Sequence, residues 1–270
     1  MLGNLGKLCC ALFAVVLGLT LASPPAATGE DANRLRGYGI RVMTFNILSS
    51  AMAPGGLDRA ARAAGQVQET GRTVVSFQEV AGDQLRVLED RLPGFHFFPR
   101  RTLGSRGSAI QIAWKQSEFR VRRSGQIYRP FMGYQRPIPF VRLQDRGTGR
   151  SFFVVAIHNS PGGYETERDI STAAEIQLIS RLEAKKGKPV LVLGDVNERD
   201  EFCRKVARAT DQISMGGRRN RPCPVPAHGG PDWMLGTWHG TDFSHYTKVY
   251  NQISDHPMVL AKVWVNDDGR

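Results

Sequence analysis

Two apolar stretches of the sequence decide its fold: FFVVAIHN at residues 152–159 and VLVLGDVN at residues 190–197. Each run ends in polar residues, and an amphipathic helical pattern over residues 165–184 separates the two. A continuous apolar run is typical of a strand covered on both faces, because a strand with one wet face alternates apolar and polar residues. The two stretches therefore predict a layered α/β protein.

The rest of the chain adds strands more often than helices. Two further helices are expected, one over residues 58–70 with Asp58 as its N-cap and one over residues 82–91. Strands are expected at residues 41–46, 73–77, 108–114, 119–127, 138–143, 233–235, 246–250 and 257–265. No internal repeat or low-complexity linker interrupts residues 41–265, so we expect one domain there.

The first 27 residues resemble a secretory signal peptide. Lys7 gives a positive start, residues 8–21 form a largely apolar run, and small residues follow. The run is shorter than the roughly 20 residues of a comfortable membrane span, which favours cleavage after Ala22 or Ala27 over a retained anchor. We therefore expect a signal peptide at residues 1–27, a polar leader at residues 28–40, and a secreted, extracellular domain.

Charge and cysteines narrow the class of partner and the compartment. The formal net charge is +11, and removal of the signal peptide leaves about +10, which favours polyanions such as nucleic acid, anionic lipid or a teichoic-like polymer. Only Cys203 and Cys223 follow the signal peptide. In an oxidising compartment they are expected to form one disulfide bond, with two free thiols as the alternative.

Polar residues stand at one end of six apolar segments. An acid at a strand end is usually a solvated turn residue, but the joint pattern is harder to explain in that way. The residues are Asn46, Glu79, His158, Asp195, Asn197, Asp232, Asp255 and His256.

These residue types fit the hydrolysis of phosphate esters, which requires a neutralised phosphate, a deprotonated water and a stabilised leaving oxygen. The oxygen ligands of Glu79, Asp255 and Asn46 suit Mg²⁺. Asp195, with Asn197 two residues later, would place a base and a hydrogen-bond donor around one phosphorus atom. A histidine oriented by an acid, as His256 by Asp232, would act as a general acid or base or stabilise phosphoryl charge.

The motifs TFN, QE, HNSPG, GDVN, DW and SDH, in this order, resemble the endonuclease/exonuclease/phosphatase superfamily, in particular its deoxyribonuclease-like members and a secreted bacterial branch. The resemblance runs from about Arg41 to Val265, nearly the whole mature chain. It implies a four-layer α/β sandwich, in which two packed mixed β-sheets are flanked by helices and the site lies at one edge.

The resemblance also implies roles for individual residues. Asn46 and Glu79 would hold the divalent metal, with Asp255 nearby. Asp195 would orient or deprotonate the water, Asn197 would bind the phosphate, His256 would pair with Asp232, and His158 would contact a phosphate oxygen.

Other positions carry weaker expectations. Arg136 resembles a phosphate-contacting arginine, with a solvated arginine as the alternative. Ser108 aligns where deoxyribonucleases place an acidic partner for the histidine at position 158. Glu175 is expected on the surface of its helix.

Three segments are candidates for substrate contacts. Residues 100–106 and 214–228 are rich in arginine and would grip nucleic acid, unless they are ordinary solvated loops. Residues 128–140 form an expected aromatic loop, which would stack on bases, enter a lipid interface or pack structurally.

We therefore expect a secreted, divalent-metal-dependent phosphodiesterase, most simply a nuclease that attacks nucleic acid with water activated by Asp195. Mg²⁺ is the expected ion, although Mn²⁺ or Ca²⁺ accepts the same ligands. The alternatives are a phospholipase-C-like sphingomyelinase at an anionic lipid or membrane surface, a small-molecule phosphomonoesterase, and, ranked last, a binding module without catalysis. No organic cofactor is expected, and the chain is expected to act as a monomer.

Overall fold

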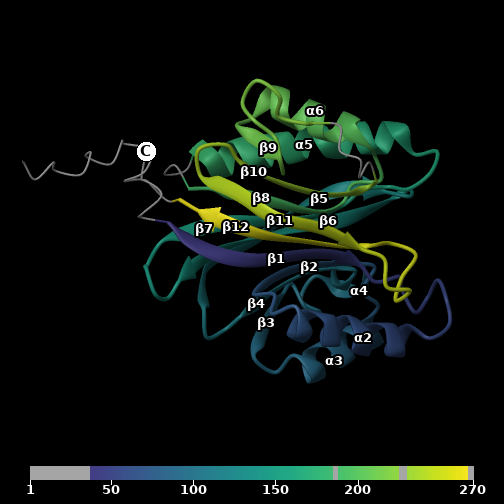
Figure 1. Ribbon diagram of the computed structural model, residues 1–270. Coiled ribbons are helices and arrows are strands. Elements are labelled where there is room, and N and C mark those ends of the chain that lie inside the picture. Colours follow the sequence, from purple (N-terminus) through teal and green to yellow (C-terminus); the bar gives the residue numbers. More distant parts are fainter. Residues whose placement is uncertain (1–36, 185–187, 225–229, 267–270) are drawn as a thin grey trace, which may run out of the picture.

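Two six-stranded β-sheets pack against each other at the centre of the computed structural model, which describes residues 37–184, 188–224 and 230–266 (Figure 1). The expected signal peptide and most of the expected leader lie outside these residues. The first sheet has the order β11-β12-β1-β2-β4-β3. Its strands are β1 (Tyr38–Asn46), β2 (Val74–Gln78), β3 (Phe95–Phe98), β4 (Ile110–Lys115), β11 (Thr241–Val249) and β12 (Met258–Val265).

The second sheet has the order β5-β6-β7-β8-β10-β9. Its strands are β5 (Phe119–Phe131), β6 (Tyr134–Asp145), β7 (Ser151–His158), β8 (Val190–Asp195), β9 (Gln212–Ser214) and β10 (Asp232–Thr237). In each sheet one inner pair is parallel, β1 with β2 and β7 with β8, while the other pairs are antiparallel. Both sheets are therefore mixed, as the resemblance implied.

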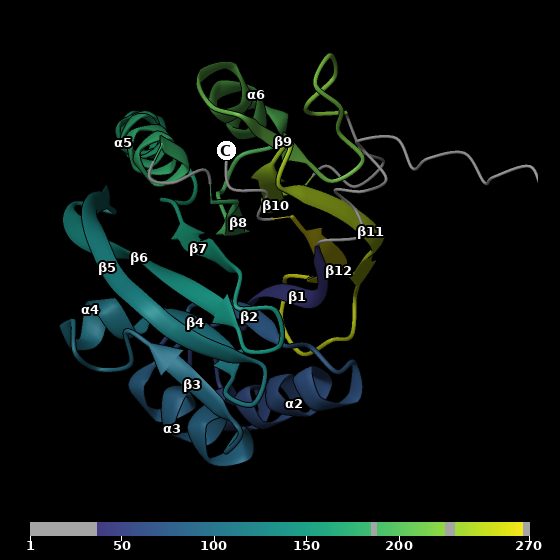
Figure 2. The same ribbon diagram turned by 90° about the vertical axis from the view of Figure 1, so that its left-hand side faces the viewer.

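Helices cover the outer face of each sheet, which completes the predicted four-layer sandwich. Figure 2 shows α2 and α3 beside the first sheet, and α5 and α6 beside the second. The described helices are α2 (Gly56–Glu69), α3 (Gly82–Arg91), α4 (Gly104–Ser108), α5 (Glu165–Ala184) and α6 (Asp200–Ala209). Within the described part of the chain, no helix combines the length and the apolar character needed to cross a membrane.

Strand β1 shows why the central strands lack polar alternation. Ile40 and Val42 belong to the core between the sheets, whereas Met43 and Phe45 belong to the core between the first sheet and helices α2 and α3. Successive side chains of a strand point to opposite faces. Val42, Met43 and Phe45 therefore make both faces of β1 apolar near its end, where the buried polar side chain of Asn46 follows.

Residues 128–140 form a β-hairpin and not the aromatic loop that we expected. β5 and β6 pair along their whole length around the turn at Met132 and Gly133. Pro137 and Pro139 obscured the strand pattern, since proline cannot donate a ladder hydrogen bond. The pairing of β6 with β7 covers only residues 140–144, so both prolines lie where β6 has β5 as its single partner.

Several boundaries also differ from expectation. β1 begins at Tyr38, before the expected Arg41. The N-cap of α2 is Gly55 in a left-handed conformation, and Asp58 lies in the first turn. Ser108 ends α4 and does not begin the next strand. The short elements β3, α4 and β9 were not predicted, because they are too short to show a periodic pattern. Helix α6 was also not predicted, although Phe202, Cys203 and Val206 form a buried stripe at helical spacing.

Candidate active site

Asp195 lies at the centre of the site, as the last residue of β8. The strand register places His158 of β7 and Asp232 of β10 directly beside it on either side. Neighbouring strands are only about 5 Å apart, so the register alone brings three predicted residues into one row. Asp195 is almost completely buried, and this burial, together with the charge of Asp232, raises the pKa of its carboxyl to about 7.

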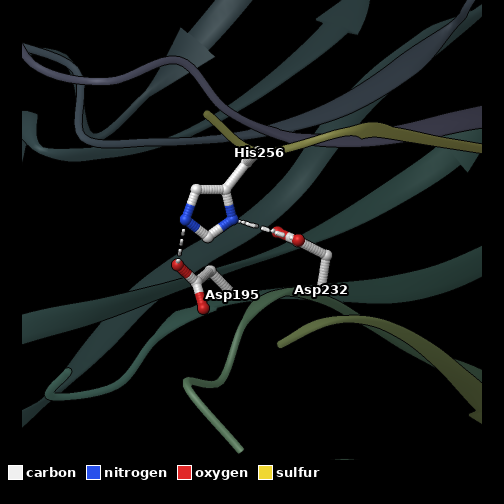
Figure 3. Close-up of side chains that lie close together, drawn as sticks. All are labelled: Asp195, Asp232 and His256. Atoms are coloured by element: carbon white, nitrogen blue, oxygen red, sulfur yellow. Dashed lines mark hydrogen bonds and ion pairs between the residues drawn. The ribbon is translucent and has the colours of Figure 1, made fainter. Parts of the chain in front are cut away.

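His256 reaches this row from the connection between β11 and β12. Its Nδ1 lies 3.2 and 3.1 Å from the two carboxylate oxygens of Asp232, and its Nε2 lies 3.7 Å from Oδ2 of Asp195 (Figure 3). Burial alone would lower the pKa of His256, but the hydrogen bond to Asp232 and the surrounding carboxylates raise it to about 9. The predicted pair of His256 and Asp232 is therefore formed, with a cationic imidazole at neutral pH.

The partner of His158 is an arginine, whereas the partner of His256 is an acid. Nη1 of Arg136 lies 2.9 Å from Nδ1 of the ring. A guanidinium can only donate, so Nδ1 accepts and the ring proton is on Nε2. That Nε2 lies 3.6 Å from Oδ2 of Asp195 and 3.9 Å from Oε1 of Glu79. Burial, Arg136 and His256 hold the pKa of His158 well below its usual value, so His158 is a neutral donor.

Arg136 is buried and does not behave as a solvated arginine. Its guanidinium carbon lies 3.2 Å from the centre of the Phe131 ring, and Nη2 donates to the Tyr134 hydroxyl at 2.8 Å. Burial lowers the pKa of Arg136, although a guanidinium keeps its charge in any case. The β5–β6 hairpin thus supplies a fixed positive charge to the His158 side of the site. Ser108 donates to the carbonyl of Ser105 at 2.7 Å and gives His158 no acidic partner.

The expected metal ligands Asn46 and Glu79 lie next to each other at the ends of β1 and β2. Nδ2 of Asn46 donates to Oε1 of Glu79 at 2.9 Å and to Oδ2 of Asp195 at 3.1 Å. The other oxygen of Glu79 accepts from the backbone N–H of Ser49 at 3.2 Å. The carboxylates of Glu79 and Asp195 therefore meet at the Asn46 amide, whose own oxygen accepts from the backbone N–H of Leu48 at 3.1 Å. Carboxylate and amide oxygens are the ligands that suit a hard divalent cation.

The other two predicted residues are less central. Asp255 is exposed, and its carboxylate accepts from the hydroxyl of Ser254 at 3.1 Å. Its charge contributes to the raised pKa of the neighbouring His256. Asn197 has a left-handed backbone, and its Nδ2 donates to the carbonyl of Asn159 at 2.8 Å.

Two buried residues of the site were missed. Asn159 directly follows His158 and is 1% exposed, and its Nδ2 donates to Oε2 of Glu175 at 3.3 Å. Glu175, expected on the helix surface, is completely buried. The polar stripe of α5, which includes Arg168, Ser171 and Glu175, faces the protein interior. Helical continuation backwards from buried Leu178 would have located Glu175.

Cys203 and Cys223 form the predicted disulfide bond, with their Cα atoms 6.0 Å apart. The bond ties α6 to the basic loop formed by residues 215–224, which follows β9. β9 is antiparallel to β10, and Ser214 pairs with Leu235. Since β10 begins at Asp232, the basic loop leaves β9 toward the site edge of the sheet. The rest of the segment that we expected to be basic includes residues 225–228, which lie outside the described residues.

Two stacked mixed sheets with histidines and carboxylates gathered at one edge define an α/β-sandwich hydrolase. The model of the endonuclease/exonuclease/phosphatase family matches residues 43–256, and the chain belongs to this family. Its members are metal-dependent phosphoester hydrolases, and this chain is one of them. A comparison with curated protein sequences gives no match.

Solved structures of this superfamily share the fold. The catalytic domain of human nocturnin with a bound sulfate anion has a TM-score of 0.69 and 17% identity, covering 85% of this chain and 97% of that one. D. rerio TDP2 in complex with a single-strand DNA product has a TM-score of 0.67 and 16% identity, covering 83% and 98%. A mannosyl-6-phosphatase from Bacteroides thetaiotaomicron has a TM-score of 0.66 and 15% identity, covering 83% and 99%. Identities this low show the fold alone.

Proposed function

We propose that the protein is a secreted, Mg²⁺-dependent phosphodiesterase that hydrolyses nucleic acid, with Asp195 as the base that deprotonates the attacking water. One observation carries the proposal. The carboxylate of Asp195 lies between Nε2 of His158 and Nε2 of His256, at 3.6 and 3.7 Å. A phosphate placed against both imidazoles would present its phosphorus to a water held by Asp195.

The protonation of the three groups supports this assignment. A general base works best when its pKa is close to the working pH, and the pKa of Asp195 is raised to about 7. His256 carries the positive charge that stabilises charge developing on the phosphoryl oxygens. His158 donates its Nε2 proton in a hydrogen bond without carrying a charge, and Arg136 behind it supplies the second cation.

A divalent ion fits the residues at the ends of β1 and β2. Asn46 and Glu79 would hold it, with Asp255 as a further carboxylate. When bound, the ion neutralises phosphate charge and polarises the ester. Mg²⁺ matches a site with few protein carboxylates, whereas Mn²⁺ or Ca²⁺ would use the same oxygens.

Nucleic acid is favoured as the substrate by the charge of the protein. The formal net charge is +11, and Arg218, Arg219 and Arg221 are exposed on the basic loop that extends toward the site edge. Phosphate contacts by arginine supply most of the affinity of non-specific nucleic-acid binding. The related fold of TDP2 carries single-strand DNA product, which supports the same substrate class.

Export is supported by the pattern of residues 1–27 and by the disulfide bond, since such bonds persist in oxidising compartments. A lipid substrate has weaker support. The hairpin tip presents Met132, which is 45% exposed, and Tyr128, which is 48% exposed, while Phe131 is buried beneath Arg136. A phosphomonoesterase remains the third alternative, in line with the mannosyl-6-phosphatase fold.

The test is hydrolysis of plasmid DNA, sphingomyelin vesicles and the p-nitrophenyl phosphate mono- and diesters, each with Mg²⁺ or EDTA. The chain is produced with its own N-terminus and recovered from the medium, and sequencing its first residue locates the cleavage. We expect Mg²⁺-dependent nicking of DNA, reduced about 10²–10⁴-fold in Asp195→Asn. Cleavage confined to the lipid or the monoester would refute the nuclease proposal, and EDTA-resistant hydrolysis would refute the metal assignment.

A further inference from the structure

Glu175 is a buried acid that the proposed reaction does not yet use. It lies on α5 and is completely buried. Among the described residues, Oε2 of Glu175 accepts a hydrogen bond from Nδ2 of Asn159 at 3.3 Å. Arg129 of β5 is the cation that faces Glu175, and Glu198, which follows β8, adds a negative charge. An ionised carboxylate in such a place is costly unless it is fully paired.

Two atoms beside this hydrogen bond are left without partners. Oε1 of Glu175 and Oδ1 of Asn159 are both buried, and neither has a hydrogen-bond partner among the described residues. Both are acceptors if Glu175 is ionised. If Glu175 is protonated, its O–H becomes a donor, and a carboxylic acid and a primary amide then match each other with two parallel hydrogen bonds. A proton on Oε1 that bonds Oδ1 of Asn159 would satisfy both orphaned atoms at once.

Asn159 connects this pair to the residues of the site. Its backbone N–H donates to the carbonyl of Asp195 at 3.0 Å, and its own carbonyl accepts from Nδ2 of Asn197 at 2.8 Å. The backbone N–H of Asn197 in turn donates to Oδ1 of Asp195 at 2.9 Å. A shift of Asn159 would therefore move both the proposed base and the proposed phosphate-binding amide.

We infer that Glu175 is a positioning residue which, as a neutral carboxylic acid paired with the Asn159 amide, holds Asp195 and Asn197 in place for hydrolysis. The expected effect on hydrolysis rests on the proposed function, whereas the acid–amide pair is independent of that function. Burial raises the pKa of Glu175 to about 8, in agreement with the neutral form at neutral pH. Arg129 opposes this rise, and Glu198 supports it.

The kinetic test compares Glu175→Gln with Glu175→Leu in the full chain, using the p-nitrophenyl diester and Mg²⁺. Glutamine keeps a planar group with one donor and one acceptor, so kcat should stay within about threefold of native. Leucine removes both, and kcat should fall about 10–100-fold, as for other residues that orient a site, with a smaller change in KM. Equal losses in the two variants would overturn the positioning role.

Glu183 provides the matched control on the same helix. It is also a partly buried acid with a raised pKa, and it accepts hydrogen bonds from Gln212 at 2.7 Å and Thr237 at 2.9 Å. A third hydrogen bond comes from the backbone N–H of Asp211, and none of these partners belongs to the proposed site. Glu183→Leu should therefore lower thermal stability while leaving kcat near native. A loss of kcat as large as that of Glu175→Leu would show that any buried acid of α5 has this effect.

The acid–amide pair has a readout that does not depend on activity. Because the folded state raises the pKa of Glu175, its proton is bound more tightly when the chain is folded. The stability from this group is full below the unfolded pKa and is lost as pH rises through about 8. Native protein should therefore lose more thermal stability than Glu175→Gln between pH 5 and about pH 9. If the thermal stability of the two proteins changes equally with pH, Glu175 is not a neutral acid in the folded chain. This outcome can be read even if the native chain hydrolyses none of the substrates.

Discussion

The two histidines of the site contact the same carboxylate, yet their surroundings give them different charges. His256 bonds the acid Asp232, which raises its pKa to about 9, whereas His158 bonds Arg136 and has a pKa well below its usual value. The chemistry of a histidine is set by what its second ring nitrogen contacts. The two sides of Asp195 are therefore not interchangeable: one provides a charged group and the other a neutral donor.

The largest effect on the difference in charge between the two histidines is expected from Asp232→Asn. The variant removes the acid that keeps His256 charged, so kcat should fall about 10²–10⁴-fold. In the native protein His256 is charged below its pKa of about 9, so activity should persist through neutral pH and decline above about pH 9. In the variant this alkaline decline should begin at lower pH. A pH–rate profile measures both, and an unchanged alkaline limb would contradict the role of the pair.

A smaller effect is expected from Arg136→Met on the other side. Methionine keeps an apolar stem against Phe131 but removes the charge next to His158. The pKa of His158 should rise toward its ordinary value, and KM for a phosphodiester should increase about tenfold, the scale of one lost charged hydrogen bond. Arg106→Met is the matched control, since Arg106 lies 4.2 Å from the Tyr134 ring and is exposed. NMR titration of the imidazoles and steady-state kinetics test both, and a similar KM for the two variants would refute the assignment.

The smallest effect on the contrast is expected from Cys203→Ser, which should leave both histidines unchanged. The disulfide bond joins residues 20 apart, and closing a loop of that size contributes about 3 kcal/mol in the chain-entropy model. Thermal melting should therefore occur at lower temperature in the variant, and reductant should lower the native melting temperature but hardly change that of the variant. Equal melting of native protein with and without reductant would mean that the bond does not stabilise the fold.

The row of His158, Asp195 and Asp232 was predictable because each residue stands at one end of an apolar strand, and strand ends on one side of a sheet gather at one edge. The four-layer sandwich followed from the resemblance and from strands that are apolar on both faces. The contact between Arg136 and His158 was not predictable in the same way, since it depends on a hairpin whose prolines hide its strands.

The burial of Glu175 shows a second limit of sequence analysis. Hydrophobic periodicity locates the buried face of a helix only where that face is apolar. The buried stripe of α5 is apolar at Leu178, Ile179 and Leu182 but polar at Ser171 and Glu175. Near the site α5 covers polar groups and not the apolar core. Hydrophobic periodicity therefore does not locate its buried residues there.

The long outer strand β5 has a consequence for how the protein behaves when it is concentrated. An open strand edge is a template on which another chain can add a strand and start aggregation. Along β5, Arg120, Arg122 and Arg123 are exposed, and Pro130 removes one backbone donor near its end. Two such edges repel each other and cannot complete a regular ladder. The same arginines that add to the positive charge of the surface thus protect the exposed margin of the sheet from self-association.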